Sequence, residues 1–257
     1  MDQHRSNPAT RPARLAEEGP LENLLHHPAE EVQRHVAAHP HLNEDLALAF
    51  LARRDLARTA IEDLTKNAGV MKSRKVISAI VMHPRAPRHV SLPIIRHLYT
   101  FELMHVALTP QVPADIKMAA EEAIVGRLET VSSGERLSLA RRCSTRVAAA
   151  LLLDKEDRVI EAALNNPHLT EAWVVKTLMN EDAPQAFVEM TCRHQKWSLR
   201  QEVRVALVRN AKTPFARVLQ FAQALPTASL RDVLRHARLE ANIKMYLMQE
   251  LESRERK

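Results

Sequence analysis

Apolar residues recur along this chain at helical spacing, and each run of them ends at a short polar corner. A valine stands eight residues before four of these corners, and a second apolar residue stands four before them. The first set is Val32, Val76, Val159 and Val203, and the second is Val36, Ile80, Ala163 and Leu207. Residues four apart lie on one face of a helix, so each pair predicts a buried helical stripe.

A proline or alanine marks each corner, and its neighbours predict how one helix ends and the next begins. The residue before a proline is pushed out of the α region, so the first helix is expected to end at His39, His83 or Asn166. A histidine there can meet free carbonyl groups. Three residues after the marker stand Asn43, Pro87, Pro113, Thr170 and Pro214. Asn and Thr cap helix N-termini and Pro suits the first turn, so the motif predicts helix, tight corner, helix.

The corners repeat with one long period. The markers are Pro40, Pro84, Pro110, Pro167, Ala211 and Ala237, spaced by 44 and 26 residues and then by 44 and 26 again. Sliding the chain by 127 residues aligns 39–118 with 166–245 without a gap, and 20 of the 80 pairs are identical. We therefore predict two tandem duplicated halves, at 13–128 and 140–254, joined by a linker at 129–139 and preceded by a disordered tail at 1–12.

Composition favours an all-α fold and narrows the functional classes. The 257 residues include 4 glycines, while Leu, Ala, Arg and Glu dominate, which disfavours β-rich folds and glycine-rich phosphate-binding loops. Two cysteines make no disulfide framework, and no apolar segment has the length of a bilayer span or the character of a secretion signal. The expectation is an all-α protein of about 14–16 short helices, in the cytoplasm and without membrane contact.

Helical hairpins with this corner, Val-x-x-x-apolar-x-x-[His/Asn]-Pro, resemble HEAT-like repeats, and the corner itself is similar to that of the variant leucine-rich repeat. The resemblance covers residues 28–250 and implies an armadillo-type α-solenoid of HEAT-like helical hairpins, a right-handed superhelix with a concave binding surface. Two departures are the irregular spacing of the corners and the lack of the cysteine cluster that holds an iron–sulfur centre in some variant leucine-rich repeat proteins. Whether the halves stack continuously or form two lobes is left open by the sequence.

Candidate catalytic and metal-binding residues are few. His35 and His39 lie four apart on one helix face, the spacing of a metal pair, but their counterparts in the second half are not histidines. A surface histidine beside a corner histidine is the preferred interpretation. Cys192 and His194 are two apart and do not face each other on a helix, and Cys143 is expected to be a small buried residue. No nucleophile, P-loop or dinucleotide motif is present, so no catalytic residue, metal or cofactor is predicted.

Positive charge is concentrated in two segments at equivalent places in the halves. Residues 66–90 carry six Lys and Arg with no acid, and 193–217 carry seven against one Glu, so each segment has a net charge of +6. The polyanion-binding candidates are Lys66, Lys72, Arg74, Arg85, Arg193, Lys196, Trp197, Arg200, Arg204 and Lys212. In this hypothesis phosphates bind by counterion release and Trp197 offers a stacking surface. In the alternative, the segments are solvated helix faces and Trp197 is buried in place of Val70.

Three functions remain. A duplicated helical design without a repeated reactive residue favours a non-catalytic scaffold that binds an unidentified protein partner on its concave face. The twin basic segments support nucleic-acid or other polyanion binding as the alternative. The third is an enzyme, because one group of HEAT-like proteins excises alkylated bases from DNA, although no stretch here matches its catalytic positions.

Overall fold

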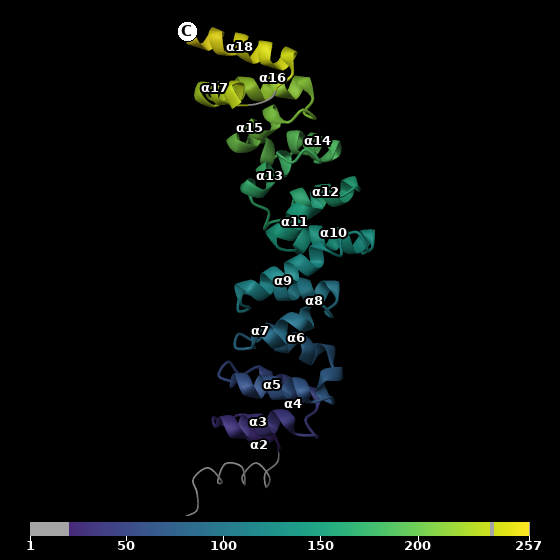
Figure 1. Ribbon diagram of the computed structural model, residues 1–257. Coiled ribbons are helices and arrows are strands. Elements are labelled where there is room, and N and C mark those ends of the chain that lie inside the picture. The colour runs from purple at the N-terminus through teal and green to yellow at the C-terminus, as the bar shows by residue number, and fades with distance from the viewer. Residues whose placement is uncertain (1–20, 237–238, 257) are drawn as a thin grey trace, which may run out of the picture. The chain divides into compact units, whose positions relative to one another are not determined.

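A computed structural model describes residues 21–236 and 239–256 of the chain. The predicted tail at 1–12 and the marker Ala237 lie outside the described residues. The described residues form 17 α-helices and two short 3₁₀ helices and contain no strand, which confirms the prediction of an all-α protein (Figure 1). The chain divides into two compact units, Met1–Gly126 and Arg127–Lys257, which are called unit 1 and unit 2.

Unit 1 is a succession of short helices. They are α2 (Leu21–Leu24), α3 (Glu30–Ala38), α4 (Glu44–Leu51), α5 (Arg58–Lys66), η1 (Val70–Lys72), α6 (Arg74–Met82), α7 (Arg88–Ile95), α8 (Thr100–Leu108) and α9 (Ala114–Val125). Helices two places apart pack together: α3 on α5, α4 on α6, α6 on α8, and α7 on α9. This packing order is typical of hairpins that stack on their neighbours.

Unit 2 repeats this plan. Its helices are α10 (Ser133–Arg142), α11 (Thr145–Leu151), α12 (Asp157–Leu164), α13 (Glu171–Leu178), α14 (Gln185–Arg193), η2 (Trp197–Leu199), α15 (Gln201–Arg209), α16 (Phe215–Ala224), α17 (Thr227–His236) and α18 (Ala241–Glu255). Here α10 packs on α12, α12 on α14, α13 on α15, α15 on α17, and α16 on α18.

The 127-residue offset of the sequence is also the offset of the helices. Adding 127 to the first residue of each element from α3 to α9 gives the first residue of the matching element from α12 to α18, the 3₁₀ helices included. The packing pairs correspond in the same way, since α3 on α5 matches α12 on α14 and α7 on α9 matches α16 on α18. Residues 127 apart are called twins below.

The predicted apolar stripes form the core, as expected from their spacing. Every stripe residue named in the sequence analysis is at most 1% exposed. Burial of each aliphatic side chain contributes about 1.5–3 kcal/mol to stability. Asn43 caps α4 by accepting a hydrogen bond from the backbone N–H of Leu46 at 2.9 Å. Pro87, Pro113 and Pro214 stand one residue before their helices, at the N-cap, rather than within the first turn.

His83 binds in two directions at its corner, whereas the His39 side chain is hydrogen-bonded, among the described residues, only within its own corner, where its Nδ1 accepts from the backbone N–H of His41 at 3.2 Å. In His83, Nδ1 accepts a hydrogen bond from the backbone N–H of Arg85 at 3.2 Å, within its own corner. Its Nε2 lies 2.7 Å from the carbonyl oxygen of Arg53, in the connection between α4 and α5. Both bonds form together only in the neutral Nε2–H tautomer, because Nδ1 must keep its lone pair. Burial, reinforced by the charge of Arg85, lowers the pKa of His83.

Asparagine binds in the same two directions with its amide group. At the equivalent place in unit 2, Asn210 accepts from the N–H of Lys212 at 2.9 Å and donates through Nδ2 to the carbonyl oxygen of Leu178 at 2.6 Å. Asn67 and Asn166 are likewise bonded to an N–H in their own corner and to carbonyls of the preceding hairpin. Asn67 is followed by no proline. Corners of that kind escape the proline pattern, so the helices outnumber the 14–16 expected.

Most of the predicted linker at 129–139 is helical in the structure. α10 begins there, and Ser132 and Glu135 form a capping box at its start. Ser132 Oγ accepts from the N–H of Glu135 at 3.3 Å, and Glu135 Oε2 accepts from the N–H of Ser132 at 3.0 Å. The sequence Ser-x-x-Glu therefore encodes a helix start, with Ser132 at the N-cap and Ser133 and Gly134 in the first turn.

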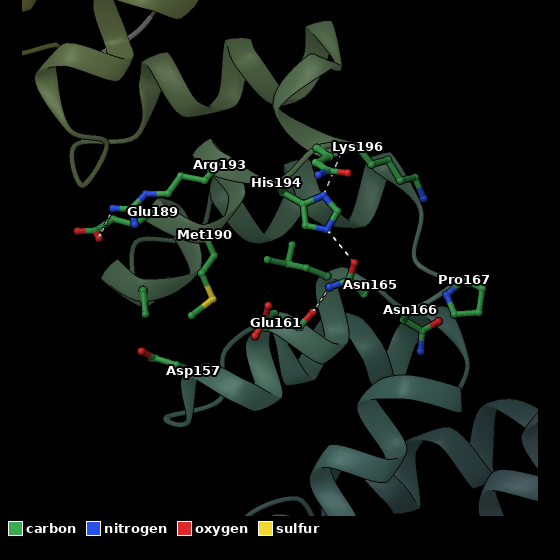
Figure 2. Close-up of a pocket in the computed structure, with 13 residues that line it drawn as sticks. Asp157, Glu161, Asn165, Asn166, Pro167, Glu189, Met190, Arg193, His194 and Lys196 are labelled. Carbon is green, nitrogen blue, oxygen red and sulfur yellow. Dashed lines mark hydrogen bonds and ion pairs between the residues drawn. The ribbon is translucent and has the colours of Figure 1, made fainter.

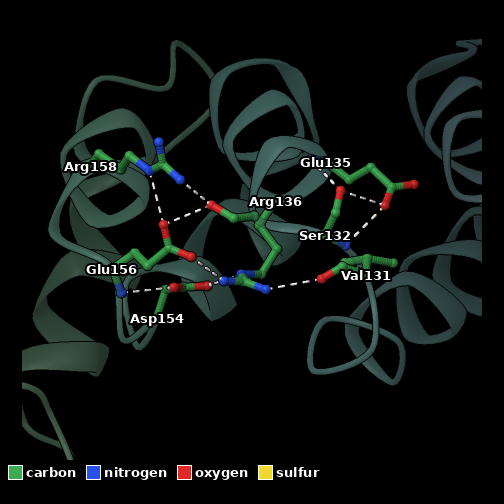
Figure 3. Close-up of polar contacts among 8 residues, drawn as sticks. Val131, Ser132, Glu135, Arg136, Asp154, Glu156 and Arg158 are labelled. Atoms are coloured by element: carbon green, nitrogen blue, oxygen red, sulfur yellow. Dashed lines mark hydrogen bonds and ion pairs between the residues drawn. The ribbon is translucent and has the colours of Figure 1, made fainter.

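Arg136 ties α10 to the corner before α12 (Figure 3). Its side chain is 8% exposed, and its guanidinium lies 2.8 Å from Asp154 Oδ2 and 2.6 Å from Glu156 Oε1. A third contact runs from Nη1 to the carbonyl oxygen of Val131 at 2.9 Å. Removing one partner of a buried pair leaves a desolvated charge and costs about 3–5 kcal/mol, so this network holds the first two hairpins of unit 2 together.

The pH dependence of stability tests the corner bond of His83. Its pKa is lower in the folded chain than the ordinary 6.5, so the unfolded chain takes up the proton first and stability falls as the pH drops below 6.5. We expect the urea concentration at the midpoint of unfolding to be lower at about pH 5.5 than at about pH 7.5. This decrease should be smaller in His83→Asn, which keeps both bonds but has no group that titrates.

The same experiment has an internal calibration. His83→Ala leaves the carbonyl of Arg53 without its buried donor and is expected to cost about 1–3 kcal/mol at neutral pH. Equal pH dependence in the wild type and in His83→Asn would contradict the assignment of the titrating group.

Candidate functional site

The first basic segment, 66–90, is largely neutralised by acids on neighbouring turns and helices. Lys66 pairs with Asp63 at 2.7 Å, Lys75 with Glu44 at 2.8 Å, Arg88 with Asp115 at 2.7 Å, and Arg74 with Glu102. Arg74 also lies over the ring of Tyr99, 4.1 Å from its centroid. Lys72 is exposed and has no side-chain ion pair with another described residue. The lack of acids within this segment therefore does not produce a continuous positive surface.

Arg85 and Lys212, which are twins, bind backbone carbonyls in the α4–α5 and α13–α14 connections respectively. Arg85 Nη1 donates to the carbonyl oxygen of Asp55 at 2.9 Å. Lys212 Nζ donates to the carbonyl oxygens of Glu181 at 3.0 Å and Ala183 at 2.5 Å. These two predicted polyanion-binding residues thus join successive hairpins.

The second basic segment, 193–217, keeps more of its positive charge in solvent. Arg193 pairs with Glu189 at 3.6 Å, and Arg204 Nε donates to the carbonyl oxygen of Ser198 at 2.7 Å. Lys196 and Arg200 are exposed, and neither forms an ion pair with an acid among the described residues. The segment lies in unit 2 and the first segment lies in unit 1.

Trp197 is a core residue, which corrects its proposed role as a stacking surface. It is 1% exposed, and its indole N–H donates to the carbonyl oxygen of Leu164 at 2.8 Å. Its twin Val70 is also buried, at 2%. The larger ring fills the same interior place, and the ammonium of Lys196 lies 3.9 Å from its centroid.

Net charge differs between the units. Residues 1–126 hold 15 Lys and Arg and 15 Asp and Glu, whereas residues 127–257 hold 22 and 16. The +6 of the whole chain therefore belongs to unit 2. An anionic ligand that binds through long-range attraction would be drawn to unit 2.

The cysteines and histidines form no reactive group among the described residues. Cys143 and Cys192 are 0% and 2% exposed, and burial raises the pKa of the Cys192 thiol to about 11. The rings of His35 and His39 lie 5.8 Å apart between centroids. Within residues 21–236 and 239–256, no three side chains of His, Cys, Asp or Glu come together in a way that would hold a metal ion.

A groove of about 740 Å³ lies between α12 and α14 of unit 2 (Figure 2). One wall carries Asp157 and Glu161 from α12, and the other carries Glu189, Met190 and Arg193 from α14. The volume falls in the range of ligand-binding pockets, and the groove is open to solvent on the side of these residues.

The end of the groove near the next corner is polar. His194 Nε2 lies 3.3 Å from Asn165 Oδ1, and His194 Nδ1 accepts from the N–H of Lys196 at 3.2 Å. Burial and the charge of Lys196 lower the pKa of His194, against the opposing effect of Glu161. A smaller hollow of about 470 Å³ between α10 and α12 shares Glu161 and Asn165 with the groove, so the surface continues along three helices.

The groove is asymmetric in charge. Arg193 is engaged by Glu189, and Lys196 lies over Trp197. Asp157 and Glu161 are exposed, and neither side chain makes a hydrogen bond or ion pair with another described residue. Because they stand four apart on one face of α12, their negative charges repel each other and remain available to a cation.

The equivalent place in unit 1 is spanned by polar contacts. There Arg34 of α3 reaches Asp63 of α5 at 2.7 Å, and Thr59 donates to Glu30 at 2.6 Å. Burial opposes ionisation of Asp63, but hydrogen bonds from Lys66 and Arg34 outweigh it and lower the pKa of Asp63. The twins of Arg34 and Asp63 are Glu161 and Met190, and the twin of Thr59 is Ala186, so unit 2 cannot make these contacts.

Sequence reasoning found Arg193 and Lys196 but not the groove that they border. A signal was present in the comparison of the halves: an arginine and an aspartate in one half become a glutamate and a methionine in the other. Apolar residues that are identical in the two halves indicate positions in a common core. A reversal or loss of charge between twins indicates a position where the two surfaces differ.

Comparison of the chain with protein-family models, with curated proteins and with solved structures finds no match. Among the helices of residues 21–236 and 239–256, none combines the length and the apolar character that crossing a membrane requires.

Thiol labelling tests the burial of the cysteines. Thiolate is the reactive form, so the raised pKa and the low exposure of Cys192 predict almost no reaction of the folded protein with Ellman's reagent near pH 8. Two thiols are expected to react once the protein is unfolded in guanidinium chloride. Rapid labelling of either cysteine in the folded protein would show that a thiol is accessible and would reopen a nucleophilic role.

Proposed function

We propose that this chain is a non-catalytic helical-repeat scaffold that binds a protein partner. In this proposal the hairpins are HEAT-like and the two units are tandem copies that form an α-solenoid. The buried cysteines, which form no disulfide, favour a reducing compartment such as the cytoplasm. The common offset of helices and packing pairs supports the duplication, because independent origins would not preserve eight consecutive element starts.

The groove between α12 and α14 is the observation that carries the proposal. Its lining mixes carboxylates, cations, amides, a histidine and the partly exposed Met190. Arginine and methionine are both enriched at protein interfaces, and methionine adapts to irregular partner surfaces. Continuation toward α10 adds Arg141, Arg158 and Leu137, so an extended chain could contact three helices in succession. In stacked helices the exposed residues that form a continuous binding surface can vary while the buried residues between the helices stay the same.

A polyanion-binding function is the second candidate, and the charge of unit 2 favours it. Lys196 and Arg200 are exposed cations without acidic partners among the described residues, in a unit with a net charge of +6. Most of the other basic candidates are engaged by acids or by backbone carbonyls, which reduces the phosphates that they can neutralise. The protein-binding proposal therefore ranks above it.

Blocking the groove tests the scaffold proposal. Ala186 lines the groove, and Ala186→Arg would place a long cationic side chain in it. We expect affinity capture from native cells, read by mass spectrometry, to recover a protein partner with the wild type and to lose it with this variant. Thr59→Arg changes the twin position in unit 1 and serves as the matched control, with capture retained. Nuclease treatment should leave capture unchanged, and a partner lost on nuclease treatment would favour the second candidate.

Charge reversal in unit 2 tests polyanion binding. If the protein binds DNA through these cations, Lys196→Glu with Arg200→Glu is expected to weaken binding to a short duplex. The slope of log K against log salt should become less steep by about 1.8, which corresponds to two phosphate contacts of about 0.9 each. Lys72→Glu, an exposed cation of unit 1, is the control and should leave the slope unchanged. An unchanged slope in the double variant would remove this function.

A further inference from the structure

The helix pair α3 and α5 of unit 1 corresponds to α12 and α14 of unit 2, but among the described residues only the pair in unit 1 is joined by an ion pair across its surface. In unit 1, the guanidinium of Arg34 crosses from α3 to the carboxylate of Asp63 on α5. In unit 2, the twin of that arginine is Glu161, and the twin of the aspartate is Met190. The helices still pack as α12 on α14 and begin at the same offset. The side chains on the surface of this helix pair therefore differ between the units, while the positions and packing of the helices correspond.

The charges of the open groove are complementary to a cation. Glu161 and Asp157 stand on the α12 wall with no side-chain partner among the described residues. The groove has cations of its own, and Arg193 is paired with Glu189. Lys196, which has no acidic partner among the described residues, lies over Trp197 at the end of the groove near His194 (Figure 2). The apolar part of Met190 stands opposite, where it can cover the stem of a long basic side chain while the charged head reaches the carboxylates.

We propose that the groove between α12 and α14 binds an arginine side chain from an extended segment of the partner protein. The guanidinium takes the place across the groove that Arg34 takes in unit 1, and Asp157 and Glu161 accept its hydrogen bonds. A planar guanidinium has five donors and can address two carboxylates at once, so arginine is preferred over lysine. This inference rests on the proposed scaffold function and specifies the partner of the same groove.

A blocked amino acid is the direct probe. N-acetyl-arginine methylamide is titrated into ¹⁵N-labelled full-length protein, with N-acetyl-citrulline methylamide as the matched uncharged control and N-acetyl-lysine methylamide as the test of preference. We expect saturable shifts of signals from α12, α14 and the side-chain amide of Asn165 with the arginine probe. The citrulline probe should give none, and the lysine probe should bind more weakly.

Two variants locate the binding. Glu161→Arg with Met190→Asp transfers the unit 1 pair into unit 2 and should fill the groove from within, so the arginine probe binds at least about tenfold more weakly, while the urea midpoint is kept or raised. Asp157→Asn with Glu161→Gln keeps the shape of the groove, removes its charge and should also weaken binding. Equal shifts from citrulline, no saturation with arginine, or undiminished binding in both variants would overturn the inference.

Failure of this inference can be told apart from failure of the scaffold function. If the arginine probe does not bind but Ala186→Arg abolishes capture of the partner, the groove binds a partner of other chemistry and the scaffold proposal stands. If the arginine probe binds but Ala186→Arg leaves capture unchanged, the groove recognises guanidinium and the partner binds elsewhere on the chain.

Discussion

The two-way hydrogen bond of the corner residue is the constraint on which the rest of this structure depends. A helix end leaves carbonyl groups without intrahelical partners, and corners packed between hairpins expose few of them to water. His83 and Asn210 meet this requirement with one acceptor for their own corner and one donor for a carbonyl at or just after the end of α4 or α13. Each of these two residues therefore holds its own turn and joins it to an earlier helix.

Asparagine and histidine can both serve because each has an acceptor, Oδ1 or Nδ1, and a separate N–H donor, Nδ2 or Nε2. Only this pair of atoms must be kept, so sequence identity between the halves can fall to 20 of 80 positions while helix starts keep their offset. The core follows the same rule, since Val70 can become Trp197 as long as the side chain stays apolar and finds a carbonyl for its N–H. The fold therefore accepts different residues at a position when they supply the same hydrogen-bonding atoms or the same apolar surface.

The features that can be predicted from the sequence are those whose interacting residues are close together along the chain. The stripes and the proline corners are local, within eight residues of each other. The pattern predicts the stripes correctly, but it misses the corner at Asn67, which has no proline. Ion pairs between hairpins join residues about one hairpin apart: 31 positions for Lys75 and Glu44, and 28 for Arg74 and Glu102. A 25-residue window such as 66–90 cannot contain both partners, so it shows a charge excess that the folded chain removes.

The same limit explains why the candidate site escaped prediction. The groove exists because two positions 29 residues apart, Glu161 and Met190, cannot form the contact that Arg34 and Asp63 form at the same separation. Neither residue is unusual in its own helix, and the signal becomes visible only when the halves are compared position by position. The start of α10 is a different case, since its capping box is a local signal that sequence reasoning can use.

Exposed ion pairs and buried stripe residues differ in how much they contribute to stability, which explains why the pair that spans the helices in unit 1 can be absent from unit 2. The pair of Arg34 and Asp63 is partly exposed, with 53% and 14% of the side chains accessible, and solvent-exposed ion pairs contribute little to stability. Each stripe residue contributes about 1.5–3 kcal/mol through burial, so losing one would threaten the whole unit. Val76 and Val203 are accordingly both valine and both buried. Exchanging the surface pair therefore gives unit 2 an open, negatively charged wall at a small cost in stability.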